Sequence, residues 1–154
     1  MAKAKILSIS YSQVAIFDGR LKAPFNEWTA AHVAQGFSWR PKSVSFASLI
    51  AAGPARLEVV TRKRFLRRKN AVRTIAVPFT VEPGMRLEVA SIAHSFPIEI
   101  AAGNYRLYYE TGSESGACWI RLTFLIDGPR EFAVLVRDGE LDPPDPLVTT
   151  AKPG

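Results

Sequence analysis

An alternation of apolar and polar residues with a period of two recurs along most of the chain and restricts it to β-structure. In residues 74–81 every second residue is large and apolar, and the same holds in residues 118–126. Successive side chains of a strand point to opposite faces of a sheet, so this period predicts half-buried strands. Turn sequences such as Glu82-Pro83-Gly84 and Asp127-Gly128-Pro129 separate the runs. Short strands at this spacing predict an all-β domain with one short helix, built as an antiparallel β-sandwich or jelly roll.

Three local signals refine this expectation. The phase of the alternation changes after Gln13, which a β-bulge near Ser12-Gln13 would explain. The short helix is predicted to begin after Asn26, a good N-cap residue, and to end at Gly36. Pro78 cannot donate to a strand ladder, so its strand is expected to lie at a sheet edge or to be bulged there.

The length of 154 residues suits a single domain. We expect residues 1–138 to form the sandwich and residues 139–154, rich in Pro and Asp, to form a flexible C-terminal tail. Cys118 is the only cysteine, so no intramolecular disulfide can form, and a cytoplasmic location is expected. No apolar run reaches the length of a membrane-spanning helix, and the basic N-terminus lacks the apolar stretch of a signal peptide.

No catalytic residue, metal site or cofactor is predicted. His32 and His94 are not at metal-ligand spacing, and the one cysteine cannot complete a site. The loop Gly112–Gly116 has Glu114 where a serine-hydrolase elbow needs serine, which favours a plain hairpin loop. Four glutamates fall in the polar phase of strands, as a solvated sheet face would require: Glu58, Glu88, Glu99 and Glu110.

The most unusual stretch is basic and lies between two predicted strands. Its six cations are Arg62, Lys63, Arg64, Arg67, Arg68 and Lys69. The net charge of the whole chain is +6, so the rest of the chain is balanced. We interpret the stretch as a hairpin arm with three alternative roles. It can contact nucleic acid, with Phe65 stacking on a base, it can dock an acidic partner, or its charges can protect a sheet edge from aggregation.

Two further groups are candidate partner-binding residues. Asp138, Glu140, Asp142 and Asp145 follow the last predicted strand without an opposing cation between Asp138 and Asp145. They could occupy a site that expects phosphates, although a solubilising tail has the same composition. Trp28 and Trp39 flank the helix end and are either interface anchors or packing residues.

An ordered series of short segments resembles the competence protein J family, the bacterial inhibitors of the DNA-entry nuclease. The series extends from Leu7 to about Thr111, and its segments are Leu7–Gln13 with Phe17, Glu27-Trp28-Thr29, Gly36-Phe37, Ser43–Phe46, Val77–Val81 and Ile98–Leu107. The basic stretch and the residues from Cys118 onward do not resemble that family.

The resemblance implies a non-enzymatic protein that binds and occludes a DNA nuclease, in competence or as an immunity partner of a nuclease toxin. The alternative is a nucleic-acid-binding β module that uses residues 62–69. A second copy of the chain is a further candidate partner, through a strand edge near Pro78.

Overall fold

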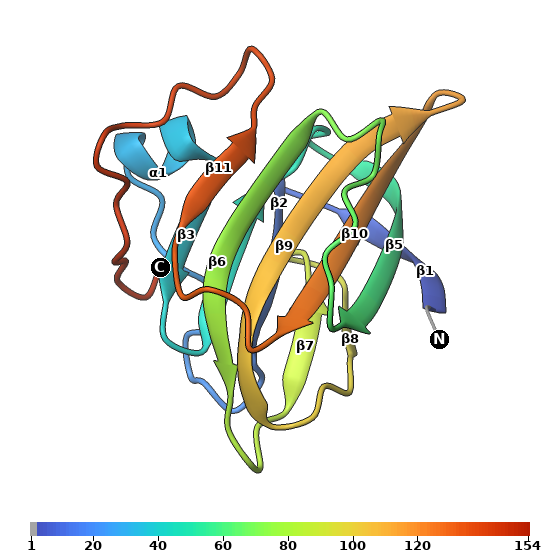
Figure 1. Ribbon diagram of the computed structural model, residues 1–154. Helices are drawn as coiled ribbons and strands as arrows, with labels where there is room; N and C mark the ends of the chain where they lie inside the picture. Colours follow the sequence, from blue (N-terminus) through green and yellow to red (C-terminus); the bar gives the residue numbers. More distant parts are fainter. Residues whose placement is uncertain (1–2) are drawn as a thin grey trace.

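The computed structural model describes residues 3–154 and places two β-sheets face to face (Figure 1). The six-stranded sheet has the order β1-β5-β10-β9-β6-β11, and the five-stranded sheet has the order β3-β4-β2-β7-β8. The strands of the first sheet are β1 (Lys3–Ile9), β5 (Gly53–Arg62), β10 (Ala117–Ile126), β9 (Gly103–Glu114), β6 (Arg73–Val81) and β11 (Ala133–Val136). Those of the second are β3 (Phe37–Arg40), β4 (Ser43–Ala47), β2 (Gln13–Asp18), β7 (Leu87–Ala90) and β8 (Ser95–Pro97). With the single helix α1 (Ala30–Gln35), this confirms a β-rich sandwich with one short helix.

The core lies between the sheets and consists of the apolar phase of the alternation. Ile75, Val77 and Phe79 of β6 are at most 1% exposed. The rings of Phe46 and Tyr109 stack across the two sheets, with centroids 4.6 Å apart. The period of two therefore identified the inward residues correctly, because each sheet buries one face against the other.

One pair of strands departs from the expected antiparallel arrangement. β5 and β10 pair in parallel. β6, which follows β5 in the chain, runs in the same direction as β5, because β10 and β9 lie between them and β9 is antiparallel to both β10 and β6. We call this connection, residues 63–72, the crossover; it runs over the outer face of the six-stranded sheet, in front of β10 in Figure 1. The predicted hairpin arm is wrong, because parallel strands cannot be joined by a hairpin.

The expected β-bulge at Ser12-Gln13 is also wrong. Ser10 and Gln13 form an isolated antiparallel bridge around Tyr11 and Ser12, which have φ values of 53° and 55°. Both central residues are left-handed, as in the tightest hairpin turns. The turn carries the chain from β1 in one sheet to β2 in the other, and this change of sheet explains the phase change.

The helix begins later than predicted. Thr29, not Asn26, is the N-cap, and its hydroxyl accepts from the backbone N–H of His32. Asn26 instead donates from its side chain to the carbonyl oxygens of Ser38 and Ser43, at 2.8 and 3.1 Å. Gly36 ends the helix as expected, with φ at 85°.

Pro78 lies where β6 has an open side, which agrees with the expected local edge. β11 pairs with residues 74–76 of β6 only, so its ladder ends before Pro78. The carbonyl oxygen of Pro78 accepts a hydrogen bond of 2.8 Å from the indole of Trp39.

Residues 139–154 contain no helix or strand but make specific contacts with α1 and the chain before it. The amide of Gln35 donates to the carbonyl of Val148 and accepts from its N–H, at 2.8 and 2.9 Å. Leu141 is 6% exposed and packs into the core. The composition of the segment did not anticipate these contacts. Among residues 3–154 no helix is long and apolar enough to cross a membrane.

Candidate partner-binding surfaces

The histidines have structural roles. The Nδ1 atom of His32 accepts from the N–H of Thr29, and its Nε2 contacts the carbonyl oxygen of Thr150 at 2.9 Å. The Nδ1 atom of His94 accepts from the N–H of Ser8 at 3.0 Å. Within residues 3–154 no three His, Cys, Asp or Glu side chains are grouped to hold a metal ion.

The Gly112–Gly116 loop and Cys118 also lack the features of a catalytic site. Gly112–Gly116 is the β9–β10 hairpin, in which Ser115 and Gly116 have φ values of 51° and 79°. Cys118 is half-buried, and burial raises the pKa of its thiol. The thiol therefore stays protonated near neutral pH, which disfavours a nucleophilic role.

Glu110 corrects the expectation of a solvated sheet face. Its side chain is fully buried, although it belongs to the polar phase of β9. Its carboxylate accepts from the guanidinium of Arg121 and from the backbone N–H of Arg68, both at 2.8 Å. The crossover covers this part of the sheet, so a residue predicted to face solvent lies in a buried ion pair.

Side-chain contacts of Phe65 and Arg68 also hold the crossover on the sheet. The Phe65 ring stacks on Tyr108 with centroids 3.8 Å apart and planes 7° apart. The Arg68 guanidinium lies 3.9 Å from the centroid of the Trp119 ring and 2.7 Å from a carboxylate oxygen of Glu114. Because Phe65 is stacked internally, the hypothesis that its ring stacks on a base is not supported by its position.

The structure divides the predicted basic residues into two kinds. The Arg68 side chain is held by Trp119 and Glu114. The other five side chains are exposed: Arg62, Lys63, Arg64, Arg67 and Lys69. None of these five forms a salt bridge within the part of the chain that the structure describes. We call these five residues the cationic surface.

The predicted acidic residues are divided in the same way. Asp138 receives two hydrogen bonds, of 2.9 and 2.8 Å, from the guanidinium of Arg73, which is only 1% exposed. Arg73 also donates to the carbonyl oxygen of Ala47 at 2.8 Å. Glu140 and Asp142 are 71% and 99% exposed, and Asp145 is exposed as well. Asp138 therefore holds the fold. Glu140 also lies 3.4 Å from the Arg73 guanidinium, but its side chain remains mostly exposed, and we call Glu140, Asp142 and Asp145 the acidic surface.

Both tryptophans predicted as possible anchors are half-buried and hydrogen-bonded. The ring of Trp39 meets Phe132 edge to face, with centroids 5.0 Å apart. The indole of Trp28 donates to the side chain of Gln13 at 3.3 Å. These contacts favour a packing role for both tryptophans over a role as interface anchors.

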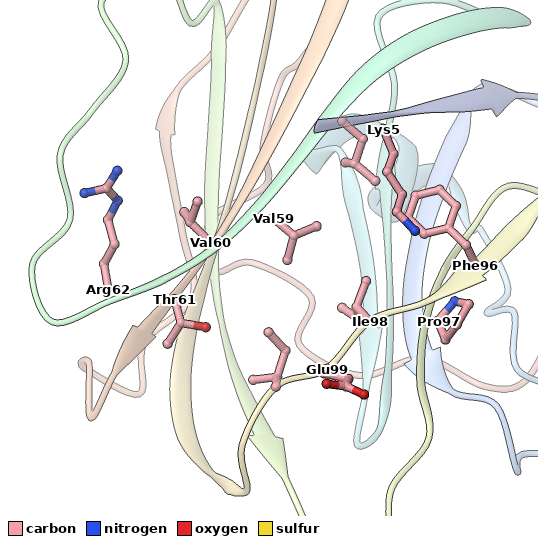
Figure 2. A pocket seen from close by; sticks show the side chains of 11 residues that line it. Lys5, Val59, Val60, Thr61, Arg62, Phe96, Pro97, Ile98 and Glu99 are labelled. Atoms are coloured by element: carbon pink, nitrogen blue, oxygen red, sulfur yellow. The ribbon is translucent and has the colours of Figure 1, made fainter. Parts of the chain in front are cut away.

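A cleft that the sequence did not reveal lies between β5 and the segment at β8 (Figure 2). Its volume is about 740 Å³, and its walls include Val59 and Ile98. The ammonium group of Lys5 lies 4.7 Å from the centroid of the Phe96 ring. The lining residues come from strands far apart in the sequence, so no local motif could have identified them.

Two comparisons with known proteins gave a match, one of sequence and one of fold. The sequence model described as Competence protein J (ComJ) matches residues 6–125. The fold is similar to the crystal structure of ComJ from Bacillus subtilis, described as an inhibitor of the DNA degrading activity of NucA. That likeness has a TM-score of 0.70 at 21% sequence identity, and it covers 80% of this chain and 95% of that chain. Comparison with curated proteins gives no significant match.

Proposed function

The chain belongs to the competence protein J family, and from this premise we propose that it binds a DNA-degrading nuclease and inhibits it. The family match over residues 6–125, most of the sandwich, is the observation that carries the proposal. The solved relative with the same fold inhibits the DNA degrading activity of NucA.

We propose that the chain acts by occlusion, without chemistry of its own. The side chains that would be first candidates for acid–base chemistry are already bound internally. His32 caps a helix, and Glu110 is paired with Arg121. An inhibitor needs a stable surface rather than a reactive group, and the sandwich offers a rigid support for one.

The acidic surface is our candidate for the electrostatic part of the contact. A nuclease that holds DNA presents positive charge to it, and Glu140, Asp142 and Asp145 offer exposed negative charge. These residues lie beyond residue 125, where the family match ends. Their contribution would therefore be particular to this chain, added to a contact made by the sandwich itself.

The proposal is tested by titrating the purified chain into a DNA-degradation assay. The nucleases are NucA from Bacillus subtilis and the most similar nuclease from the genome that encodes this chain. We expect inhibition that saturates near an equimolar ratio, together with a complex that elutes as one species from a sizing column. Full activity of both nucleases at a tenfold molar excess of the chain would contradict the proposal.

The acidic surface is tested with the triple variant E140Q/D142N/D145N. We expect roughly tenfold weaker inhibition at low salt, mainly through slower association, and a smaller effect at high salt. The matched control E99Q/D127N/E131Q also removes three exposed negative charges, from other parts of the surface. Equal inhibition by both variants would exclude a role for the acidic surface while leaving the family function intact.

A further inference from the structure

The proposed inhibition assigns no role to the cationic surface, which is a concentration of positive charge. Arg62, Lys63, Arg64, Arg67 and Lys69 are all exposed and lie within eight consecutive residues. Such a segment spans at most roughly 26 Å when fully extended. Arg56 of β5 adds a further exposed cation on the same face, beside Trp119 in the register of β5 and β10.

The crossover presents these charges from a fixed backbone. Phe65 and Arg68 are interleaved with the exposed cations and are held by Tyr108, Trp119 and Glu114. The guanidinium of Arg121 also donates to the carbonyl oxygen of Leu66. A backbone fixed in this way loses little conformational entropy when its charged side chains meet a partner.

The composition of this surface favours a polyanion over a folded acidic protein. Protein interfaces are centred on desolvated aromatic and apolar side chains, with charges at the rim. Here the aromatic ring of Phe65 is already stacked on Tyr108, and Leu66 is the only large apolar side chain left exposed between Arg62 and Lys69. A row of cations without an aromatic centre suits a phosphate backbone.

The same stacking selects duplex DNA over a single strand. Proteins that hold single strands stack bases on free aromatic rings, and the crossover has no free ring to offer. A duplex presents only its phosphates and groove edges, and phosphates need no stacking platform.

We infer that the cationic surface binds the phosphate backbone of double-stranded DNA without reading its sequence. This goes beyond the proposed inhibition and does not depend on it, since the residues involved are distinct from the acidic surface. A nuclease site that attracts DNA would repel these cations, which leaves the cationic surface free while the chain is bound to the enzyme.

The test measures binding of the full-length chain to a fluorescein-labelled 30-base-pair duplex of arbitrary sequence by anisotropy, without nuclease. If all five cations contact phosphates, the logarithm of affinity falls with the logarithm of salt concentration with a slope of about −4.5. Affinity should then drop about 500-fold between 50 and 200 mM salt. A labelled single strand of equal length should bind more weakly.

The variant K63Q/R64Q/R67Q should lose most of this affinity and reduce the slope to about −1.8. The control K22Q/R86Q/K152Q removes the same charge from three other exposed positions and should keep the slope of the wild type. No binding by the wild type at 50 mM salt would overturn the inference. Equal loss in both variants, or binding to a poly-glutamate peptide but not to DNA, would overturn it as well.

A nuclease assay separates this inference from the proposed function. The variant K63Q/R64Q/R67Q should still inhibit the nuclease if inhibition is a protein–protein contact. Loss of inhibition in this variant would mean that the chain protects DNA by coating it, which would contradict the occlusion proposal while supporting DNA binding.

Discussion

Replacing Asp138 by alanine should destabilise the fold strongly, although Asp138 lies in a segment rich in exposed acidic residues. The Arg73 guanidinium is 1% exposed and is bound by both carboxylate oxygens of Asp138. Removing the closest partner of a buried charge costs about 3–5 kcal/mol when that charge is left uncompensated. Asp138 is itself 20% exposed, Ala47 still accepts from Arg73, and the exposed Glu140 carboxylate stays 3.4 Å from the guanidinium, so we expect the lower end, about 3 kcal/mol.

The free energy of unfolding is measured by urea denaturation, and the midpoint of thermal unfolding should fall by about 6–12 °C in a domain of this size. Asp142→Ala is the matched control, because Asp142 is 99% exposed and 3.6 Å from Arg137. An exposed pair of this kind contributes less than about 1 kcal/mol, so the control should unfold close to the wild type.

The double variant R73M/D138A tests whether the loss of stability in D138A comes from the buried charge of Arg73. It removes the buried charge as well as its partner, so it should be more stable than D138A alone. A loss below 1 kcal/mol in D138A, or a double variant less stable than D138A, would refute the assignment of Asp138 to the fold.

Two further perturbations address the fold. The guanidinium of Arg20 and backbone N–H groups lower the pKa of Asp18 from 3.8 to about 2. Because the folded-state pKa of Asp18 lies below its unfolded value, the ionised carboxylate stabilises the fold above about pH 4. About 2 kcal/mol of the free energy of unfolding should therefore be lost as the pH falls from about 4 to 2, and urea titrations of Asp18→Asn should show a smaller loss over this range. Gly36→Ala should lower the free energy of unfolding by about 1–2 kcal/mol in thermal unfolding, because the φ of Gly36 is 85° and the new Cβ would lie 3.1 Å from a side-chain atom of Leu141. The control Gly139→Ala should be neutral, because its new Cβ would meet nothing within 4 Å. Equal losses in the two variants would contradict this account.

The strands and the core could be predicted because their signal is local. Ile75, Val77 and Phe79 alternate with polar or small residues, and this pattern is sufficient to assign one buried face. The end of the helix at Gly36 was predictable for the same reason, since a left-handed C-cap favours glycine.

The turn at Tyr11-Ser12 could not be predicted from its residues. Two left-handed residues in a tight turn normally appear as Asn-Gly or Asp-Gly. Tyrosine and serine carry no such signal, so the phase change after Gln13 was assigned to a bulge. The predicted start of the helix was wrong for a related reason. Asn26 has the chemistry of an N-cap, but its side-chain amide donates to the carbonyl oxygens of Ser38 and Ser43 instead.

The burial of Glu110 depends on a contact that no local pattern contains. The backbone N–H that binds its carboxylate belongs to Arg68, which lies 42 positions earlier in the chain. Asp138 and Asp142 pose the same problem, because both are acidic residues of one segment. Only the position of Arg73, 65 residues before Asp138, decides which of them is structural.

We infer that the choice of partner depends on residues that the core does not constrain. At 21% identity to the solved relative, the sandwich is retained, so its alternating core tolerates extensive substitution. Residues such as Ile75 and Val77 therefore specify the fold and carry little information about what it binds. The outward-facing charges are not constrained by the core, and in this chain clusters of exposed like charge lie in the crossover and in the segment after β11. If both proposals hold, the two charged surfaces separate two tasks on one rigid support: the acidic surface adds to a contact with the nuclease, and the cationic surface keeps the inhibitor on the DNA that the nuclease would degrade.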